Sequence, residues 1–166
     1  GELSAEYPIP LTPAGYTFSI WGLIYLGLTL YIISQALPKP LNDTRIRLLD
    51  LPFRLSSLCN ILWLLVWHYR HLTLSVFCML GLLSSLCWSY LLLNRQNRYK
   101  DVVSKWFVEQ TFSIYLGWVS LATMINISVW LYASGWTGGG LSPQVWTVLL
   151  LIIACGLFLY LGLRHQ

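Results

Sequence analysis

An apolar stretch in the second half of the chain carries polar and aromatic side chains at a regular spacing. At about 100° per residue, five of them fall within an arc of about 120° on one helix face. They are Tyr115, Trp118, Ala122, Asn126 and Trp130. Indole N–H, phenol and amide groups on such a face supply hydrogen bonds, and the rings supply flat apolar surface. In lipid the Asn126 amide costs free energy unless it meets a partner inside the protein.

Two other apolar stretches present similar faces. Each has three side chains at positions i, i+3 and i+7, which share one side of a helix. The side chains are Phe18, Trp21 and Tyr25 in the first stretch, and Asn60, Trp63 and Trp67 in the second. Three converging faces of this kind form a cavity walled by rings, which suits a flat, conjugated apolar ligand or a sterol. The alternative is that the rings only pack in the core and the amides bond to neighbouring helices.

Other chemically active groups are few. His68 and His71 flank a predicted turn, where they are either axial ligands to a haem iron or chlorophyll magnesium, or exposed turn residues. Glu109 is either a proton or metal-centre ligand, or a carboxylate that reaches out to a basic loop. The four cysteines lie in apolar runs without metal-ligand spacing. The sequence has no nucleophile paired with a base and no phosphate-binding loop, so we expect no catalytic residues, no metal site and no enzyme.

Composition indicates the environment of these faces. Of the 166 residues, 57% are hydrophobic and only 10% are charged, and the mean hydropathy is +0.64. A soluble domain has about 25% charged residues. The net charge of +4 does not indicate a nucleic-acid partner, because the positive residues sit in short loops between apolar runs. We therefore expect an integral membrane protein.

The hydrophobic runs predict an all-α bundle of five transmembrane helices in a single domain, 1–166. A proline-rich lead-in, 1–15, is expected on the extracytoplasmic side. Pro52 suits the first turn of the second helix. Trp106, Trp136 and Trp146 stand at helix ends, as interface anchors do. The helices are expected at about 16–37, 52–68, 72–93, 106–132 and 143–163.

The basic residues indicate the orientation of these helices. The loops at 38–54 and 94–105, together with the C-terminal tail, hold every Lys and Arg except Arg70. Basic loops stay on the cytoplasmic side of a membrane. The pattern therefore predicts five spans with the N-terminus on the non-cytoplasmic side of a bacterial inner, thylakoid or organelle membrane.

Three motifs resemble, in order, those of the translocator protein family, the TspO/MBR or tryptophan-rich sensory proteins. The face from Tyr115 to Trp130 resembles the signature of the family's last helix. The stretch Leu58–Trp63 is similar to its L-x-L-N-x-L-W helix, and Pro13–Tyr25 to its P-P-x-W-x-F…W-x-x-x-Y helix. Tyr16 stands where the family has Trp, and Ile114 replaces the proline before the tyrosine.

The ends of the sequence differ from the family pattern. The family's first helix would precede the Pro13 motif, where this sequence has only the lead-in. The helix expected at 143–163 lies beyond the family's usual end. The resemblance therefore implies an extended branch with its first helix absent and an extra C-terminal helix.

The resemblance implies a protein that binds a porphyrin, haem, a chlorophyll-type tetrapyrrole or a sterol, as a carrier, sensor or scavenger with no obligatory cofactor. The alternative is a small accessory subunit of a larger membrane complex, such as a pigment-protein complex. The partners are then membrane lipid, the hydrophobic ligand, and a second copy in a homodimer or the larger complex. The implied ligand site comprises Phe18, Trp21, Tyr25, Asn60, Trp63, Tyr115, Trp118, Ala122 and Asn126.

Overall fold

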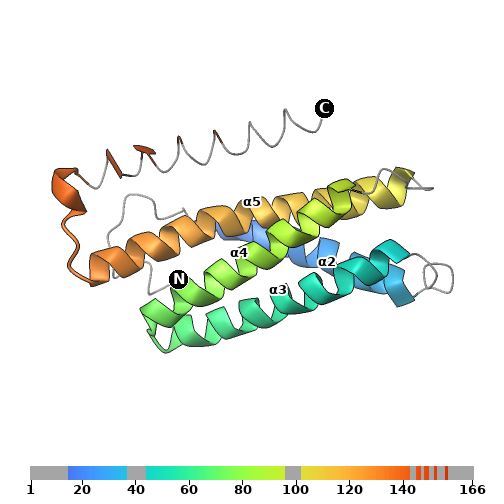
Figure 1. Cartoon of the computed structure of the whole chain (residues 1–166), viewed down its shortest axis with the longest axis horizontal. Coiled ribbons are helices and arrows are strands. Elements are labelled where there is room, and N and C mark those ends of the chain that lie inside the picture. The colour runs from blue at the N-terminus through green and yellow to red at the C-terminus, as the bar shows by residue number, and fades with distance from the viewer. Residues whose placement is uncertain are drawn as a thin grey trace.

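The computed structural model describes residues 15–36, 44–95 and 102–142, with isolated positions at 145, 146, 148, 149, 152 and 156. Within these residues the structure is helical and has no strand. The elements in chain order are a 3-10 turn η1 (Gly15–Ser19), α2 (Ile20–Ala36), α3 (Thr44–His68), α4 (Leu72–Arg95), α5 (Val102–Ala133) and a 3-10 turn η3 (Gly138–Gly140) (Figure 1).

Among the described residues, four helical segments are long and apolar enough to cross a membrane, which takes about 20 residues. The segments are Gly15–Ile33, Leu48–His68, Leu72–Leu93 and Phe107–Ala133. The prediction of an all-α membrane protein is confirmed for the described residues. The predicted lead-in up to residue 14 lies outside them, and so does the fifth predicted helix, 143–163, apart from the isolated positions.

The start of α3 differs from the prediction. We expected the helix to begin at Pro52, but it begins at Thr44, about two turns earlier, and Pro52 lies inside it. Proline removes one backbone hydrogen bond, which is why it usually stands in a first turn. Here Leu49 and Pro52 are buried, and Arg54 pairs with Asp50 across the same turn at 2.7 Å. Tertiary packing thus stabilises a helical segment before Pro52 that local preference alone would leave outside the helix.

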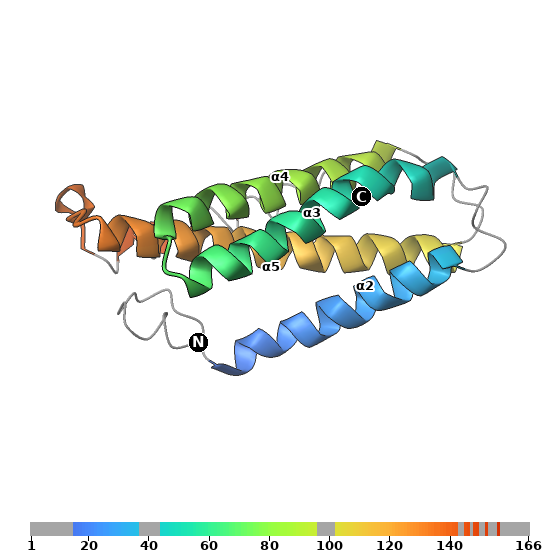
Figure 2. The ribbon, with the colours of Figure 1, turned by 90° about the horizontal axis from the view of Figure 1, so that it is seen from below.

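The helices pack in an open series. α3 packs along α4, α4 along α5, and α2 along α5 (Figures 1 and 2). The core between them consists of buried aliphatic and aromatic side chains. Its fully buried members include Ile24, Tyr31, Met79, Leu82, Leu86, Phe112 and Val119.

The α3–α4 connection is a tight turn at the predicted position. α3 ends at His68 and α4 begins at Leu72. The His71 N–H donates to the Val66 carbonyl at 2.9 Å and the Arg70 N–H to the Trp67 carbonyl at 3.1 Å, the pattern of a Schellman helix end. Arg70 adopts φ 61°, a conformation that favours glycine. The turn makes α3 and α4 antiparallel neighbours.

Candidate functional site, an aromatic cluster between α2 and α5

Five of the predicted site residues form one group of contacting rings, which we call the aromatic cluster. Trp21 stacks on Tyr25, with ring centroids 5.4 Å apart. The edge of Trp21 meets Tyr115 at 6.1 Å and Trp118 at 6.2 Å. Phe18 of η1 meets Trp118 edge to face at 6.0 Å. The cluster therefore joins the N-terminal end of α2 to the middle of α5.

The cluster has a closed side and an open side. On α5, Tyr115 is 2% exposed and Trp118 is 6% exposed. On the other side, Tyr25 is 47% exposed and Phe18 is 37% exposed, while Trp21 is half-buried between the two. A flat apolar molecule that covers the open side would gain ring contact.

Four buried polar atoms on α3 and α5 lack a hydrogen-bond partner among the described residues. They are Nε1 of Trp118, Nε1 of Trp63, Oδ1 of Asn60 and Nδ2 of Asn126. A buried polar group without a partner costs about 1–3 kcal/mol, so such groups are uncommon in a finished core. Among the described residues, Trp118 and Trp63 thus each keep an unused N–H donor, and Asn60 keeps an unused carbonyl acceptor.

The α3 members of the predicted site do not extend the ring contacts of the cluster. The ring contact of Trp63 is with Trp67, at 6.0 Å and 30°. Asn60 is 9% exposed and lies one turn before Trp63 on the same helix. The Tyr115 hydroxyl is within electrostatic range of Tyr25 on α2 and Cys59 on α3. Tyr115 therefore lies near both α2 and α3, and Asn60 follows Cys59 in the α3 sequence.

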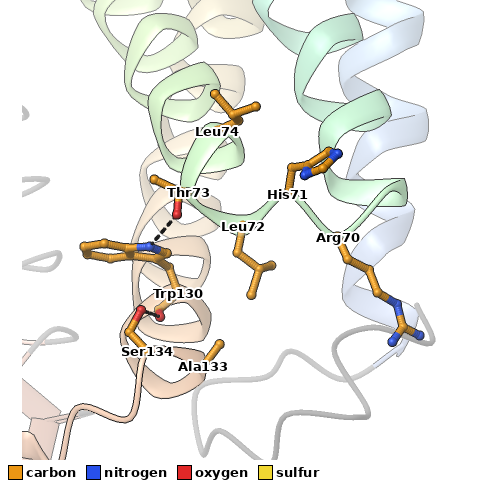
Figure 3. Close-up of a pocket in the computed structure, with 8 residues that line it drawn as sticks. All are labelled: Arg70, His71, Leu72, Thr73, Leu74, Trp130, Ala133 and Ser134. Atoms are coloured by element: carbon orange, nitrogen blue, oxygen red, sulfur yellow. Dashed lines mark hydrogen bonds between the residues drawn. The ribbon is translucent and has the colours of Figure 1, made fainter.

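The second half of the predicted α5 face meets α4. The Ser75 hydroxyl donates to Oδ1 of Asn126 at 3.1 Å. The Trp130 indole N–H donates to the Thr73 hydroxyl at 3.1 Å (Figure 3). Ala122, between the two halves, is partly buried against the core. The structure thus brings Phe18, Trp21, Tyr25, Tyr115 and Trp118 together, and places Asn126 against α4.

Asn126 keeps spare hydrogen-bonding capacity. It is 2% exposed, and its Nδ2 has no partner among the described residues. Ser75 also donates to the Leu72 carbonyl at 2.7 Å, although a hydroxyl has only one hydrogen to share between two acceptors. The Asn126–Ser75 contact is therefore a polar link between α4 and α5 with one amide hydrogen-bonding group left over.

The two histidines lie away from the aromatic cluster. His68 is exposed and meets Tyr69 edge to face. His71 borders an open hollow of about 350 Å³ at the end where α4 begins, together with Arg70, Thr73, Trp130 and others (Figure 3). Glu109 is partly buried near the start of α5. Among the described residues, no three His, Cys, Asp or Glu side chains gather as a metal ion would require.

A family model described as TSPO-like protein matches residues 1–166. The chain belongs to the TSPO-like family. The match includes the lead-in and the segment after Ser142 as well as the four described helices. Among curated proteins no match was found, and none was found among solved structures.

Membership in the TSPO-like family confirms the resemblance drawn from the three motifs. Together with the four apolar helices among the described residues, this family membership indicates an integral membrane protein. Sequence reasoning missed Thr73 and Ser75, the α4 partners of the α5 face. Their signal was weak because α4 has other serines, such as Ser85 and Ser89, that only bond to their own helix.

Proposed function

We propose that this TSPO-like membrane protein binds a flat, conjugated apolar ligand of the tetrapyrrole type at the aromatic cluster, as a carrier, sensor or scavenger and without catalysis. The ligand class includes porphyrin, haem and chlorophyll-type pigments. The observation that carries the proposal is the combination of a half-open group of five rings with the unpartnered N–H of Trp118 inside it.

The binding mechanism follows from the two kinds of group. The exposed faces of Tyr25 and Phe18 offer ring surface against which a macrocycle stacks. Carboxylate or carbonyl groups at the ligand's edge accept hydrogen bonds from the indole N–H groups of Trp118 and Trp63. Asn60 Oδ1 accepts from a ligand N–H or O–H. Each such bond satisfies a protein group that is otherwise desolvated at a cost.

A fluorescence titration tests this proposal. Protoporphyrin added to the protein in nanodiscs should quench tryptophan emission and saturate at one ligand per chain. Trp63→Phe keeps a ring but deletes one unpartnered N–H, and should raise Kd about tenfold, the effect of losing about 1.4 kcal/mol. Trp88→Phe on the exposed side of α4 is the matched control and should leave Kd unchanged.

Two outcomes of this titration would contradict the proposal. Quenching that rises linearly with lipid-dissolved protoporphyrin would indicate partitioning into the bilayer without a site. Equal Kd values for Trp63→Phe and Trp88→Phe would show that the Trp63 indole N–H does not contribute to binding. A protein that does not bind and purifies in a stoichiometric membrane complex would favour the accessory subunit instead.

We propose five spans with the N-terminus on the non-cytoplasmic side. Arg54 and Arg95 lie toward the end of the bundle where α3 begins and α4 finishes, whereas Arg70 lies at the opposite end (Figure 1). This distribution supports a cytoplasmic location of the Arg54 end. A membrane-impermeant maleimide should label Tyr69→Cys in intact cells, and a cysteine at Arg98 only after permeabilisation. The reverse pattern would overturn this orientation.

A further inference from the structure

α2 is attached to the bundle along one narrow stripe. Among its described side chains, the fully buried positions are Ile24, Gly27 and Tyr31, which follow i, i+3 and i+7. Leu23 and Leu26 beside this stripe are 55% and 58% exposed. One stripe of contacts fixes the distance of a helix from its neighbour but leaves rotation about the crossing point weakly resisted.

The crossing point of α2 lies near the middle of the helix, at Gly27. A Cβ atom at Gly27 would stand 2.7 Å from both Cγ2 and Oγ1 of Thr111, so α2 and α5 approach there as closely as a glycine allows. One turn further on, Tyr31 packs edge to face against Phe53 of α3 and Phe112 of α5, each at 5.4 Å. These contacts make a tight joint of three helices.

The other half of α2 makes no ring contact with α3 among the described residues. The ring contacts that Trp21 makes outside its own helix go to α5. Figure 1 shows α2 and α3 moving apart from the joint toward the end at which α2 begins. The open side of the aromatic cluster, at Tyr25 and Phe18, lies on this diverging half of α2 and η1.

We propose that the ligand enters the aromatic cluster sideways from the bilayer, between α2 and α3, and that α2 swings about its joint at Gly27 and Tyr31 to admit it. The inference rests on the proposed function, since it concerns the route to the same site. This route restricts the ligand to molecules that are dissolved among the acyl chains of the bilayer. Such a molecule need not cross the headgroup region to reach the rings, and helix swings of this kind take microseconds to milliseconds.

Two pairs of exposed positions measure the swing. Leu23 on α2 and Ile61 on α3 report on the diverging end, and Ile33 with Leu51 reports on the joint. In a variant without native cysteines, each pair is changed to cysteine and spin-labelled, and the distance distribution is recorded in nanodiscs. The Leu23→Cys/Ile61→Cys distribution should be the broader one and should narrow when protoporphyrin is added. Equal widths for the two pairs without ligand would overturn the swing.

The same pairs test the route. A short bismaleimide spacer across Leu23→Cys and Ile61→Cys should slow the quenching by vesicle-dissolved protoporphyrin about tenfold, as a closed gate does. The spacer across Ile33→Cys and Leu51→Cys should change the rate by less than about twofold. Equal rates would overturn lateral entry. If the unlinked protein shows no saturable quenching, the proposed function fails, whereas the distance distributions still decide whether α2 swings.

A substitution at the crossing point gives an independent check. Gly27→Ala forces α2 away from Thr111 and should speed protoporphyrin dissociation about threefold or more. Thr111→Ala removes both atoms that a Cβ at Gly27 would meet at 2.7 Å, so the double variant should return toward the wild-type rate. Gly22→Ala is the matched control, because its Cβ would meet no atom within 4 Å. The same rate for Gly27→Ala and Gly22→Ala would contradict a joint at this point.

Discussion

The face of α5 from Tyr115 to Trp130 meets two neighbours in two different ways. Its first half packs against rings of α2 and η1, and the Trp118 N–H stays without a partner among the described residues. Its second half is hydrogen-bonded to α4 through Asn126 and Trp130. Ring contacts tolerate sliding, whereas hydrogen bonds fix both distance and angle. One helix face thus has a half held by ring contacts and a half held by hydrogen bonds.

The largest expected effect comes from removing a ring from the first half of the α5 face. Trp118→Ala removes a ring that is 6% exposed and contacts Phe18 and Trp21, and should lower the free energy of unfolding by about 3–5 kcal/mol. Trp130→Ala removes a half-buried ring and should lower the free energy of unfolding by less than half as much. Unfolding in mixed micelles measures both. Equal losses would break the distinction between a packed half and a hydrogen-bonded half.

A smaller effect is expected from the polar link in the second half. A double-mutant cycle of Ser75→Ala and Asn126→Ala should give a coupling energy of about 0.6–1.7 kcal/mol, the range for hydrogen bonds between membrane helices. Because Asn126 faces α4, neither substitution should change the Kd for protoporphyrin. A coupling energy of zero would contradict the polar link between α4 and α5. A large change in the Kd for protoporphyrin would place Asn126 at the ligand site.

The smallest effect concerns the hydrogen bond at the end of the face. Thr73→Val removes the acceptor of the Trp130 N–H while keeping the side-chain shape. The bond is exposed, so the loss of unfolding free energy should be only about 0.5 kcal/mol. Thr123→Val is a useful control, because its hydroxyl bonds only within α5, to Val119. A larger loss at Thr123 than at Thr73 would show that the bond to Trp130 does not support the α4–α5 contact.

The sequence predicted the helices better than their contacts. Spacing of 3.6 residues per turn placed Tyr115, Trp118, Asn126 and Trp130 on one face, because that depends only on local geometry. Which neighbour meets each half depends on the angle at which helices cross. That angle follows from contacts distant in sequence, such as Gly27 with Thr111, which no local pattern reveals.

The turns show the same limit. The boundary between α3 and α4 at His68 and Leu72 agreed with the sequence because polar residues interrupt two apolar runs there. The start of α3 did not, since Pro52 is a local signal for a helix start that burial of Leu49 and Pro52 outweighs. Likewise, the unpartnered atoms of Asn60, Trp63 and Trp118 are visible only once every neighbour is in place.

Two matched substitutions on α5 test the central claim most directly. Trp118→Phe deletes an indole N–H that lacks a partner in the part of the chain that the structure describes, and Trp130→Phe deletes one that is bonded to Thr73. Both keep an aromatic ring on the same helix face. The Kd for protoporphyrin, measured by titration in nanodiscs, should rise about tenfold for Trp118→Phe and stay within about twofold for Trp130→Phe. Equal changes in Kd for the two variants would contradict a ligand site at the aromatic cluster.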